Sequence, residues 1–150
     1  MIKYFEGDVF TSSQPAFGHG VNCKGRMRSG IAVDVRLRYP DVYEAYARYC
    51  KSPGLNPGDV FMMKAESDGK LIFNLASQYK EGRNATYPYL EESLWNAFDL
   101  LEEREIEGIA LPRIGCGVGG LNWAKVKPMI EDIADNYSLI EVEIWTPAGI

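Results

Sequence analysis

Two glycine-rich segments far apart in the chain carry the residue types that bind phosphate through the backbone. The first runs from Gly25 to Ala32, and the second runs from Gly115 to Gly120. Each follows an apolar, strand-like run and leads into a helical pattern, so its backbone N–H groups can converge on an anion at the positive end of a helix dipole. Two such loops in one small protein predict a ligand with more than one phosphate, held between them.

Three polar side chains near these loops are candidates for further chemistry. Asp8 follows Gly7 after the first apolar run, where it either caps a turn or accepts a hydrogen bond from a ligand. Asn22 ends the second apolar run and tolerates the backbone of a turn. His19 is the single histidine; it is the side chain that titrates near neutral pH when unperturbed, although a lone histidine in an apolar strand is commonly structural.

Alternating strand and helix patterns must position these residues. The sequence predicts strands at 2–10, 16–22, 59–65, 70–77, 106–112 and 141–145, and helices at 31–37, at 41–50, from about Thr86, and after a cap at Asn122. Pro40 separates the first two helices, and Asp68-Gly69 indicates a hairpin. Strands that alternate with amphipathic helices predict the α/β class, with a mixed sheet covered by helices on both faces.

Composition excludes several classes of protein. The 150 residues are 46% hydrophobic and 25% charged, which suits one domain with its own core. The net charge of −5 provides no overall field that attracts nucleic acid or an anionic membrane. There is neither a signal-peptide pattern at the N-terminus nor an apolar run of the roughly 20 residues that a membrane span requires. We therefore expect a cytoplasmic monomer.

The cysteines and the second loop each exclude one further interpretation. Three cysteines make an odd count, which argues against a disulfide framework, and together with His19 they match no common zinc spacing, so we expect no metal. Cys116 has no evident base partner for a nucleophilic role. Residues 115–120 fit the dinucleotide-binding glycine pattern literally, but only about 30 residues follow them, which is too few for the rest of a Rossmann sheet.

Four segments, taken together, resemble the macro domain family. They are Gly7 to Val9, His19 to Gly25, Ser29 to Ala32, and Pro112 to Trp123, in the family's order across nearly the whole chain. The most similar branch contains ADP-ribose 1''-phosphate phosphatases and terminal ADP-ribose glycohydrolases, and the break at 38–40 resembles the phosphatases. The resemblance implies a single macro domain over residues 1–150, with a three-layer α/β/α fold, a mixed central sheet, and ADP-ribose bound beyond the carboxyl ends of the strands.

The resemblance also implies roles for individual residues. Asp8 would accept a hydrogen bond from the adenine amino group, and Val9 would offer backbone contacts. Asn22 would contact the hydroxyls of the distal ribose, because an amide both donates and accepts. Asn22 and His19 are the catalytic candidates, with His19 orienting water or moving a proton. The remaining expected ligand contacts lie in the two loops: Ser29, Gly30, Ile31 and Ala32, then Gly115, Cys116, Gly117, Val118 and Gly119.

Three positions depart from the family pattern. Arg28 stands where this branch has glycine, and it either points to solvent or reaches a phosphate. Gln78 and Gly119 stand where the protein glycohydrolases of the branch have lysine and aspartate. Lys80 could replace that lysine only if its loop were shifted by two residues. These departures argue against a mechanism through a lysine adduct.

The sequence therefore predicts a protein that binds ADP-ribose and, without a cofactor, hydrolyses ADP-ribose 1''-phosphate to ADP-ribose and phosphate. Water attack at phosphorus and at the anomeric carbon are both open. Two alternatives stay open as well: a hydrolase that removes ADP-ribose from protein or nucleic-acid conjugates, and a reader without catalysis. The acidic net charge disfavours nucleic acid, except as a modified substrate that enters only the pocket.

Overall fold

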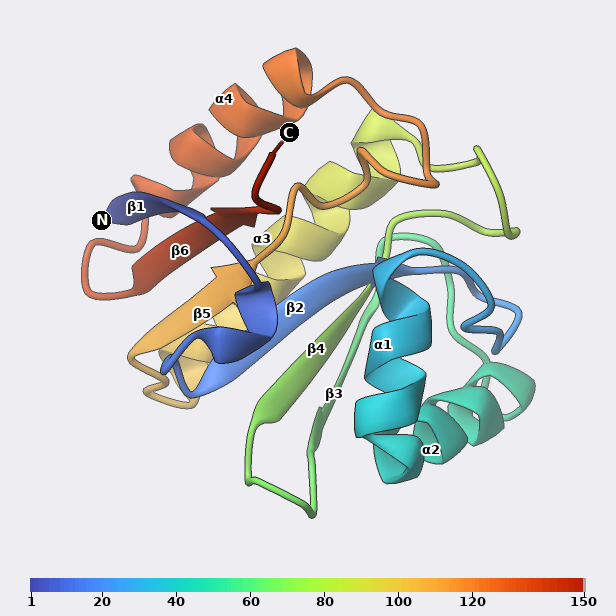
Figure 1. Ribbon diagram of the computed structural model, residues 1–150. Helices are drawn as coiled ribbons and strands as arrows, with labels where there is room; N and C mark the ends of the chain where they lie inside the picture. Colours follow the sequence, from blue (N-terminus) through green and yellow to red (C-terminus); the bar gives the residue numbers. More distant parts are fainter. Residues whose placement is uncertain (150) are drawn as a thin grey trace.

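The computed structural model describes residues 1–149 as a six-stranded sheet between two layers of helices (Figure 1). Ile150, the last residue of the predicted domain, lies outside the described residues. The strands are β1 (Ile2–Glu6), β2 (Ala16–Val21), β3 (Val60–Lys64), β4 (Leu71–Ala76), β5 (Gly108–Leu111) and β6 (Glu141–Thr146). The helices are the 3-10 helix η1 (Val9–Thr11), α1 (Ile31–Arg38), α2 (Pro40–Lys51), α3 (Tyr87–Glu103) and α4 (Trp123–Ala134).

The sheet is mixed, and its order brings distant segments together. The strand order is β1-β6-β5-β2-β4-β3, and β3 pairs antiparallel with β4 whereas the other neighbours pair in parallel. Because parallel strands end at the same edge of a sheet, the loops after β2, β4, β5 and β6 meet there. The predicted three-layer α/β/α fold with a mixed central sheet is confirmed.

Each face of the sheet has its own apolar core. Phe17 and Ile72 belong to the cluster that packs under α1 and α2, whereas Phe73 and Leu75 belong to the cluster under α3 and α4. Neighbouring residues of a strand point to opposite faces, so both faces of β2 and β4 are apolar and buried. Figure 1 shows α1 and α2 on one side of the sheet and α3 and α4 on the other.

Most predicted elements are observed, with one substantial difference at the N-terminus. The strand expected over 2–10 ends at Glu6, and the chain turns into η1. The Asp8 carboxylate caps this turn by accepting a hydrogen bond from the backbone N–H of Phe10 at 3.0 Å. The break between α1 and α2 falls at Tyr39, with Pro40 in the first turn of α2, where a missing N–H costs nothing.

Two other expectations about local structure are confirmed, and one finding concerns membranes. The Asp68-Gly69 turn joins the antiparallel pair β3 and β4, with φ of 76° at Gly69. Asn122 caps α4 by accepting a hydrogen bond from the N–H of Ala124 at 2.9 Å. Within residues 1–149, no helix is both long enough and apolar enough to cross a membrane.

Candidate active site

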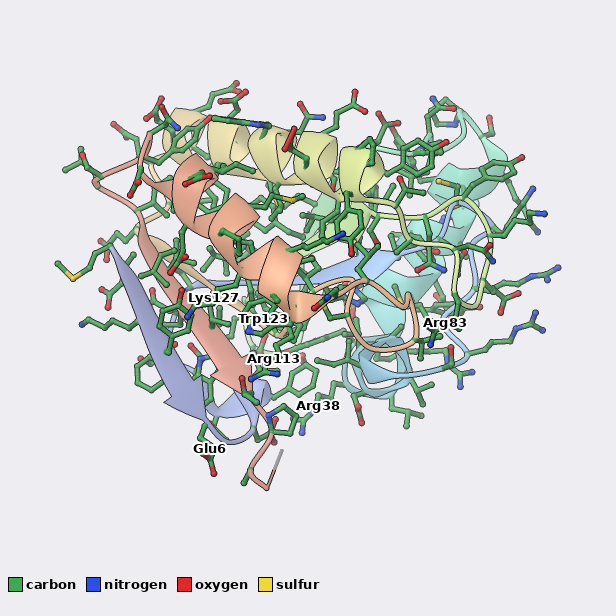
Figure 2. The ribbon with its side chains drawn as sticks, turned by 90° about the horizontal axis from the view of Figure 1, so that it is seen from above. Glu6, Arg38, Arg83, Arg113, Trp123 and Lys127 are labelled. Atoms are coloured by element: carbon green, nitrogen blue, oxygen red, sulfur yellow. The ribbon has the colours of Figure 1, made fainter. Side chains whose placement is uncertain are left out.

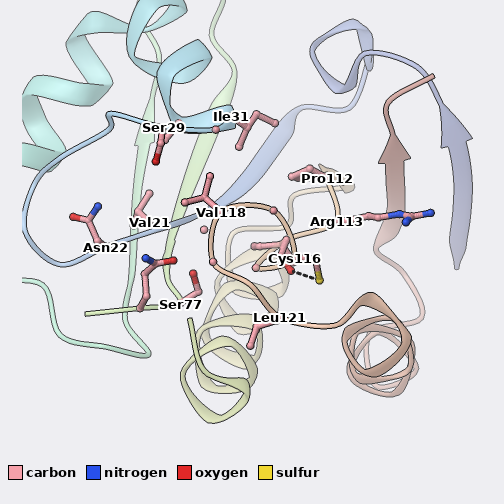
Figure 3. A pocket seen from close by; sticks show the side chains of 18 of the residues that line it. Val21, Asn22, Ser29, Ile31, Ser77, Pro112, Arg113, Cys116, Val118 and Leu121 are labelled. Atoms are coloured by element: carbon pink, nitrogen blue, oxygen red, sulfur yellow. Dashed lines mark hydrogen bonds between the residues drawn. The ribbon is translucent and has the colours of Figure 1, made fainter. Parts of the chain in front are cut away.

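A pocket of about 540 Å³ lies at the carboxyl ends of the parallel strands (Figure 3). Both glycine-rich loops line it, the first after β2 and the second after β5. The residues expected at the ligand that do line it are Asn22, Ser29, Gly30, Ile31, Ala32, Gly115, Cys116, Gly117, Val118 and Gly119. The fold thus brings together two loops that are about 85 residues apart along the chain, at the edge where ligands bind in open α/β sheets.

Asn22 organises the first loop with its side chain. Its Oδ1 accepts a hydrogen bond from the backbone N–H of Lys24 at 2.9 Å, and its Nδ2 donates to the carbonyl oxygen of Arg26 at 2.8 Å. The hydroxyl of Tyr46, from α2, donates to the Asn22 carbonyl oxygen at 2.7 Å. Asn22 therefore shapes the turn through its side chain and not through a left-handed backbone, and its expected contact with the distal ribose stays a prediction. An amide carries two donor hydrogens, so one is left for a ligand in the pocket.

The two loops approach each other at Gly30 and Val118. Gly30 precedes α1 with φ of 62°, in a region that side chains disfavour, and a Cβ there would lie 3.1 Å from Cγ2 of Val118. Figure 3 shows Val118 of the second loop beside Ser29 and Ile31 of the first. The first turn of α1 presents N–H groups that have no partner within the helix. Val118 and the first turn of α1 together form one wall of the pocket.

The second loop is held by its own backbone. The N–H of Cys116 donates to the carbonyl of Arg113 at 3.1 Å, and the N–H of Leu121 donates to the carbonyl of Gly115 at 2.9 Å. Within residues 1–149, the N–H groups of Gly117 and Val118 have no acceptor. Such unpaired N–H groups in a tight loop are the donors that bind anions.

His19 is not brought to the pocket, which corrects the expectation that it orients water or moves a proton there. Its side chain is fully buried under α1 and α2, with Nε2 at 2.7 Å from Oδ1 of Asn74 and its ring stacked on Phe17. Burial lowers the pKa of His19 to about 4, so the imidazole is neutral near pH 7. The physical reason is the strand alternation, which turns residue 19 into the core together with residue 17.

Asp8 and Val9 also lie outside the pocket lining. Val9 is buried in η1, and Asp8 is exposed with Oδ2 at 3.8 Å from the guanidinium of Arg38. The same guanidinium lies over the ring of Phe10, 4.3 Å from its centroid. The turn is adjacent to the pocket wall, because the N–H of Gly7 donates to the carbonyl of Thr146. Pro147, which follows Thr146, lines the pocket. The expected adenine contacts of Asp8 and Val9 therefore stay predictions.

The pocket has two chemically different ends. Figure 3 shows Asn22, Val21 and Ser77 on one side and Arg113 on the other. Arg113 is fixed by a hydrogen bond from its Nε to Oγ1 of Thr146 at 3.0 Å, and its guanidinium lies over the ring of Trp123. Figure 2 shows this pair together, with Arg83 well away from it.

Ser77 is a pocket residue that sequence reasoning missed. It follows β4, is 1% exposed, and its Oγ has no hydrogen-bond partner within the described residues. Gly20 of β2 makes room for it, since a Cβ there would lie 2.6 Å from Oγ of Ser77. A buried hydroxyl without a partner is costly unless a ligand or water binds it. The sequence does not reveal that β2 pairs with β4, and it is this pairing that brings the ends of both strands together at the pocket.

Gln78 and Gly119, two of the three departures from the family pattern, are explained by packing. Nε2 of Gln78 donates to the carbonyl oxygens of Lys80 and Gly82 at 2.6 and 2.8 Å, which closes the loop after β4. A Cβ at Gly119 would lie 2.8 Å from Cβ of Ala85, so an aspartate does not fit there without movement of the backbone. Lys80 is not part of the pocket lining.

Two acids in the pocket lining, the Cys116 thiol and the Glu81 carboxyl, have shifted pKa values, and the hydrogen bond to Glu81 also raises the pKa of Arg28. Burial raises the pKa of the Cys116 thiol to about 11, and its Sγ lies 3.4 Å from the carbonyl oxygen of Ile114. Glu81 accepts hydrogen bonds from Arg28 and Arg26, and the bond from Arg28 in particular lowers its pKa to about 2. Neither group exchanges a proton near neutral pH, so the pocket offers neutral hydrogen-bonding groups and fixed charges.

Relatives of named activity match nearly the whole chain. A DNA ADP-ribosyl glycohydrolase of Mycobacterium tuberculosis is 29% identical, and the match covers 99% of this chain and 43% of the relative. The chain thus spans less than half the length of that relative. An ADP-ribose 1''-phosphate phosphatase of Debaryomyces hansenii is 25% identical, and the match covers 97% of this chain and 98% of the relative.

The fold has solved counterparts of the same kind. The macrodomain of Mycobacterium tuberculosis DarG superposes with a TM-score of 0.91 at 27% identity, over 97% of each chain. Residues 19–130 match the family profile described as Macro domain, a span that contains both glycine-rich loops. The resemblance stated from the sequence is confirmed, and the chain belongs to the macro domain family.

Proposed function

We propose that this macro domain binds ADP-ribose between its two glycine-rich loops and hydrolyses ADP-ribose 1''-phosphate to ADP-ribose and phosphate. The observation that carries the proposal is the chemistry of the Asn22 end of the pocket. Asn22, Ser77 and Gln78 are neutral, and the pKa values of the lining groups Cys116, Glu81 and Arg28 are all shifted away from neutrality. Such a site positions a substrate and water well, but it transfers protons poorly.

A glycosyl phosphate suits a site of this kind. When water attacks the anomeric carbon, the leaving group departs as a phosphate, whose second pKa is about 6, so this route needs no general acid at neutral pH. The relative from Debaryomyces hansenii with the phosphatase name supports this substrate. A leaving group that departs through a nucleobase nitrogen, a sugar oxygen or a serine oxygen requires more proton transfer in the transition state than phosphate does.

Each part of the pocket has one task in this proposal. The unpaired N–H groups of Gly117 and Val118 and the first turn of α1 bind the diphosphate. The free amide hydrogen of Asn22 and the hydroxyl of Ser77 bind the distal ribose and the attacking water. Water attacks either phosphorus, which breaks the bond from phosphorus to the 1''-oxygen and releases ADP-ribose as the leaving group, or the anomeric carbon, which breaks the bond from C1'' to oxygen and releases phosphate. Reaction in ¹⁸O-labelled water separates the two routes, because the label enters phosphate only in the first.

Removal of ADP-ribose from DNA or protein is the second candidate. The name of the mycobacterial relative favours it for that protein. Against it, Gln78 and Gly119 replace the lysine and aspartate of the protein glycohydrolases, and Gly119 lies too close to Ala85 to carry a side chain.

The test is a phosphorus NMR time course on ADP-ribose 1''-phosphate, with ADP-ribosylated DNA and ADP-ribosylated protein assayed in parallel. We expect inorganic phosphate to grow while the diphosphate signals persist, and we expect Ser77→Ala to slow this release about tenfold or more. Cleavage of a conjugate without phosphate release would support the second candidate. Shifted signals without any product would indicate a reader instead.

A further inference from the structure

The loop after β4 places a carboxylate between two arginines of the first glycine-rich loop. Glu81 Oε1 lies 2.6 Å from a terminal nitrogen of Arg28 and 3.2 Å from one of Arg26, and Oε2 lies 3.0 Å from Nε of Arg28. Arg28 therefore binds the carboxylate with both arms of its fork. This is the geometry in which guanidinium groups bind either carboxylate or phosphate.

All three side chains belong to the pocket. Arg26, Arg28 and Glu81 line it beside Asn22 and Gln78, at the end away from Arg113. The arginine side chains are 54% and 59% exposed, so they can turn toward a ligand without loss of core packing. Long, half-exposed side chains of this kind are adaptable in position but fixed in charge.

The ion pairs are not needed to hold the first glycine-rich loop against the loop after β4. The N–H of Cys23 donates to the carbonyl of Tyr79 at 3.0 Å, and the ammonium of Lys24 donates to the Tyr79 hydroxyl at 2.9 Å. Nε2 of Gln78 closes the Glu81 loop independently. Exposed ion pairs add little to stability in general. A structural role therefore does not account for two arginines that converge on one anion at the pocket.

We propose that Arg26 and Arg28 form an anion subsite for a phosphomonoester on the distal ribose, and that Glu81 occupies this subsite until the substrate's phosphate displaces its carboxylate. This inference rests on the proposed function, because it concerns the terminal phosphate of the same substrate. Arg26 and Arg28 are then specificity-determining residues that distinguish the phosphorylated ligand from plain ADP-ribose. Glu81 is an internal competitor that weakens the binding of the phosphate and eases its release.

The inference is tested by comparing two ligands on the same protein. The probes are ADP-ribose and the methylene phosphonate analogue of ADP-ribose 1''-phosphate, whose C–P linkage resists hydrolysis, at about pH 8, where the phosphonate is doubly charged. Isothermal titration calorimetry gives both dissociation constants for the wild type, for R26Q/R28Q and for E81Q. Arg104→Gln is the matched control, since it removes one charge from the exposed C-cap of α3, outside the pocket lining.

We expect the wild type to prefer the phosphonate. In R26Q/R28Q this preference falls about tenfold or more, while the affinity for ADP-ribose changes by less than about twofold. In E81Q the preference rises by about threefold or more, because the competing charge is gone. The control retains the wild-type preference.

Two results would overturn the inference. The first is an unchanged preference in R26Q/R28Q, and the second is a parallel loss of affinity for both ligands, which indicates a structural role. The outcome is independent of turnover, since neither probe is hydrolysed. A wild type that prefers the phosphonate but releases no phosphate from ADP-ribose 1''-phosphate contradicts the proposed function and leaves the subsite standing.

Discussion

The first glycine-rich loop is held by side chains, whereas the second is held by its own backbone. In the first, the amide of Asn22 bonds to the backbone of Lys24 and Arg26, and the arginines pair with Glu81. In the second, turn hydrogen bonds between main-chain groups set the shape, and Gly119 packs against Ala85 with no room for a side chain.

This difference separates two tasks in one pocket. A loop held by its backbone has a fixed shape and a fixed set of N–H donors, which suits the invariant diphosphate of the ligand. A loop held by side chains carries charge that can move, which suits the variable group on the distal ribose. The second loop therefore provides shape, and the first provides selectivity.

Asn22→Ala is expected to have the largest effect, because it removes the side chain on which the first loop depends. It leaves the N–H of Lys24 and the carbonyl of Arg26 without their partner and removes a ligand donor. We expect kcat/KM for ADP-ribose 1''-phosphate to fall about a hundredfold. Asn22→Asp keeps the acceptor for Lys24 and is expected to restore stability but not activity. A fully active Asn22→Ala would contradict the role given to the first loop.

Two glycine variants test the second loop at a position where space is tight and at one where it is open. A Cβ at Gly119 meets Ala85 and the carbonyl of Gly115, whereas a Cβ at Gly117 has no atom within 4 Å. We expect Gly119→Ala to lower Tm by several degrees, about 1–3 kcal/mol of overpacking. Gly117→Ala should leave Tm within about 2 °C and weaken ADP-ribose binding about tenfold, since a methyl group in this open space at the pocket lining would crowd the proposed diphosphate site. Thermal unfolding and calorimetry measure both, and reversed results would refute this assignment of shape and binding.

The pH dependence of stability tests whether the buried side chain of His19 contributes to the stability of the fold. The folded pKa of His19, about 4, lies below the unfolded value of 6.5, so the unfolded chain binds the extra proton between these pH values. Stability is therefore full above pH 6.5 and is lost as pH falls toward 4, by an amount on the order of 3 kcal/mol from this group. Urea unfolding of wild type and His19→Gln across this window should show a smaller pH slope in the variant.

The same variant separates a structural from a catalytic histidine. Because His19 lies outside the pocket lining, the folded His19→Gln protein should retain kcat at about pH 7.5 within about threefold. A drop of about a hundredfold in kcat with unchanged stability would restore the proton-shuttle interpretation.

Cys116→Ala is expected to have the smallest effect, because a loop held by its backbone does not depend on this side chain. The raised pKa of the thiol keeps it protonated near neutral pH, so it is a poor nucleophile. We expect kcat/KM within about twofold of wild type, and slow alkylation by iodoacetamide. A large loss of activity would mean that the second loop acts through a side chain after all.

The fold and the two loops could be predicted because local signals determine them. Hydrophobic periodicity, Pro40 and the glycines mark elements whatever their neighbours are. The burial of His19 and the place of Ser77 in the pocket could not be predicted, because they depend on which strands pair and on the face of the sheet to which each side chain points. The ion pairs of Arg28 with Glu81 join loops 53 residues apart, and only the sheet order brings them together. The expected cap at Asp8 is observed, but the strand expected over 2–10 ends at Glu6, because this capping bond begins a turn within the apolar pattern.

The most direct test of the account is a titration of ¹⁵N-labelled protein with ADP-ribose, followed by amide chemical shifts. The account predicts that the largest shifts fall on the N–H groups of Gly30, Ile31, Gly117 and Val118, where both loops face the pocket, with small shifts at His19. Large shifts confined to one loop, or centred away from the pocket, would contradict the claim that the diphosphate is bound between the two loops.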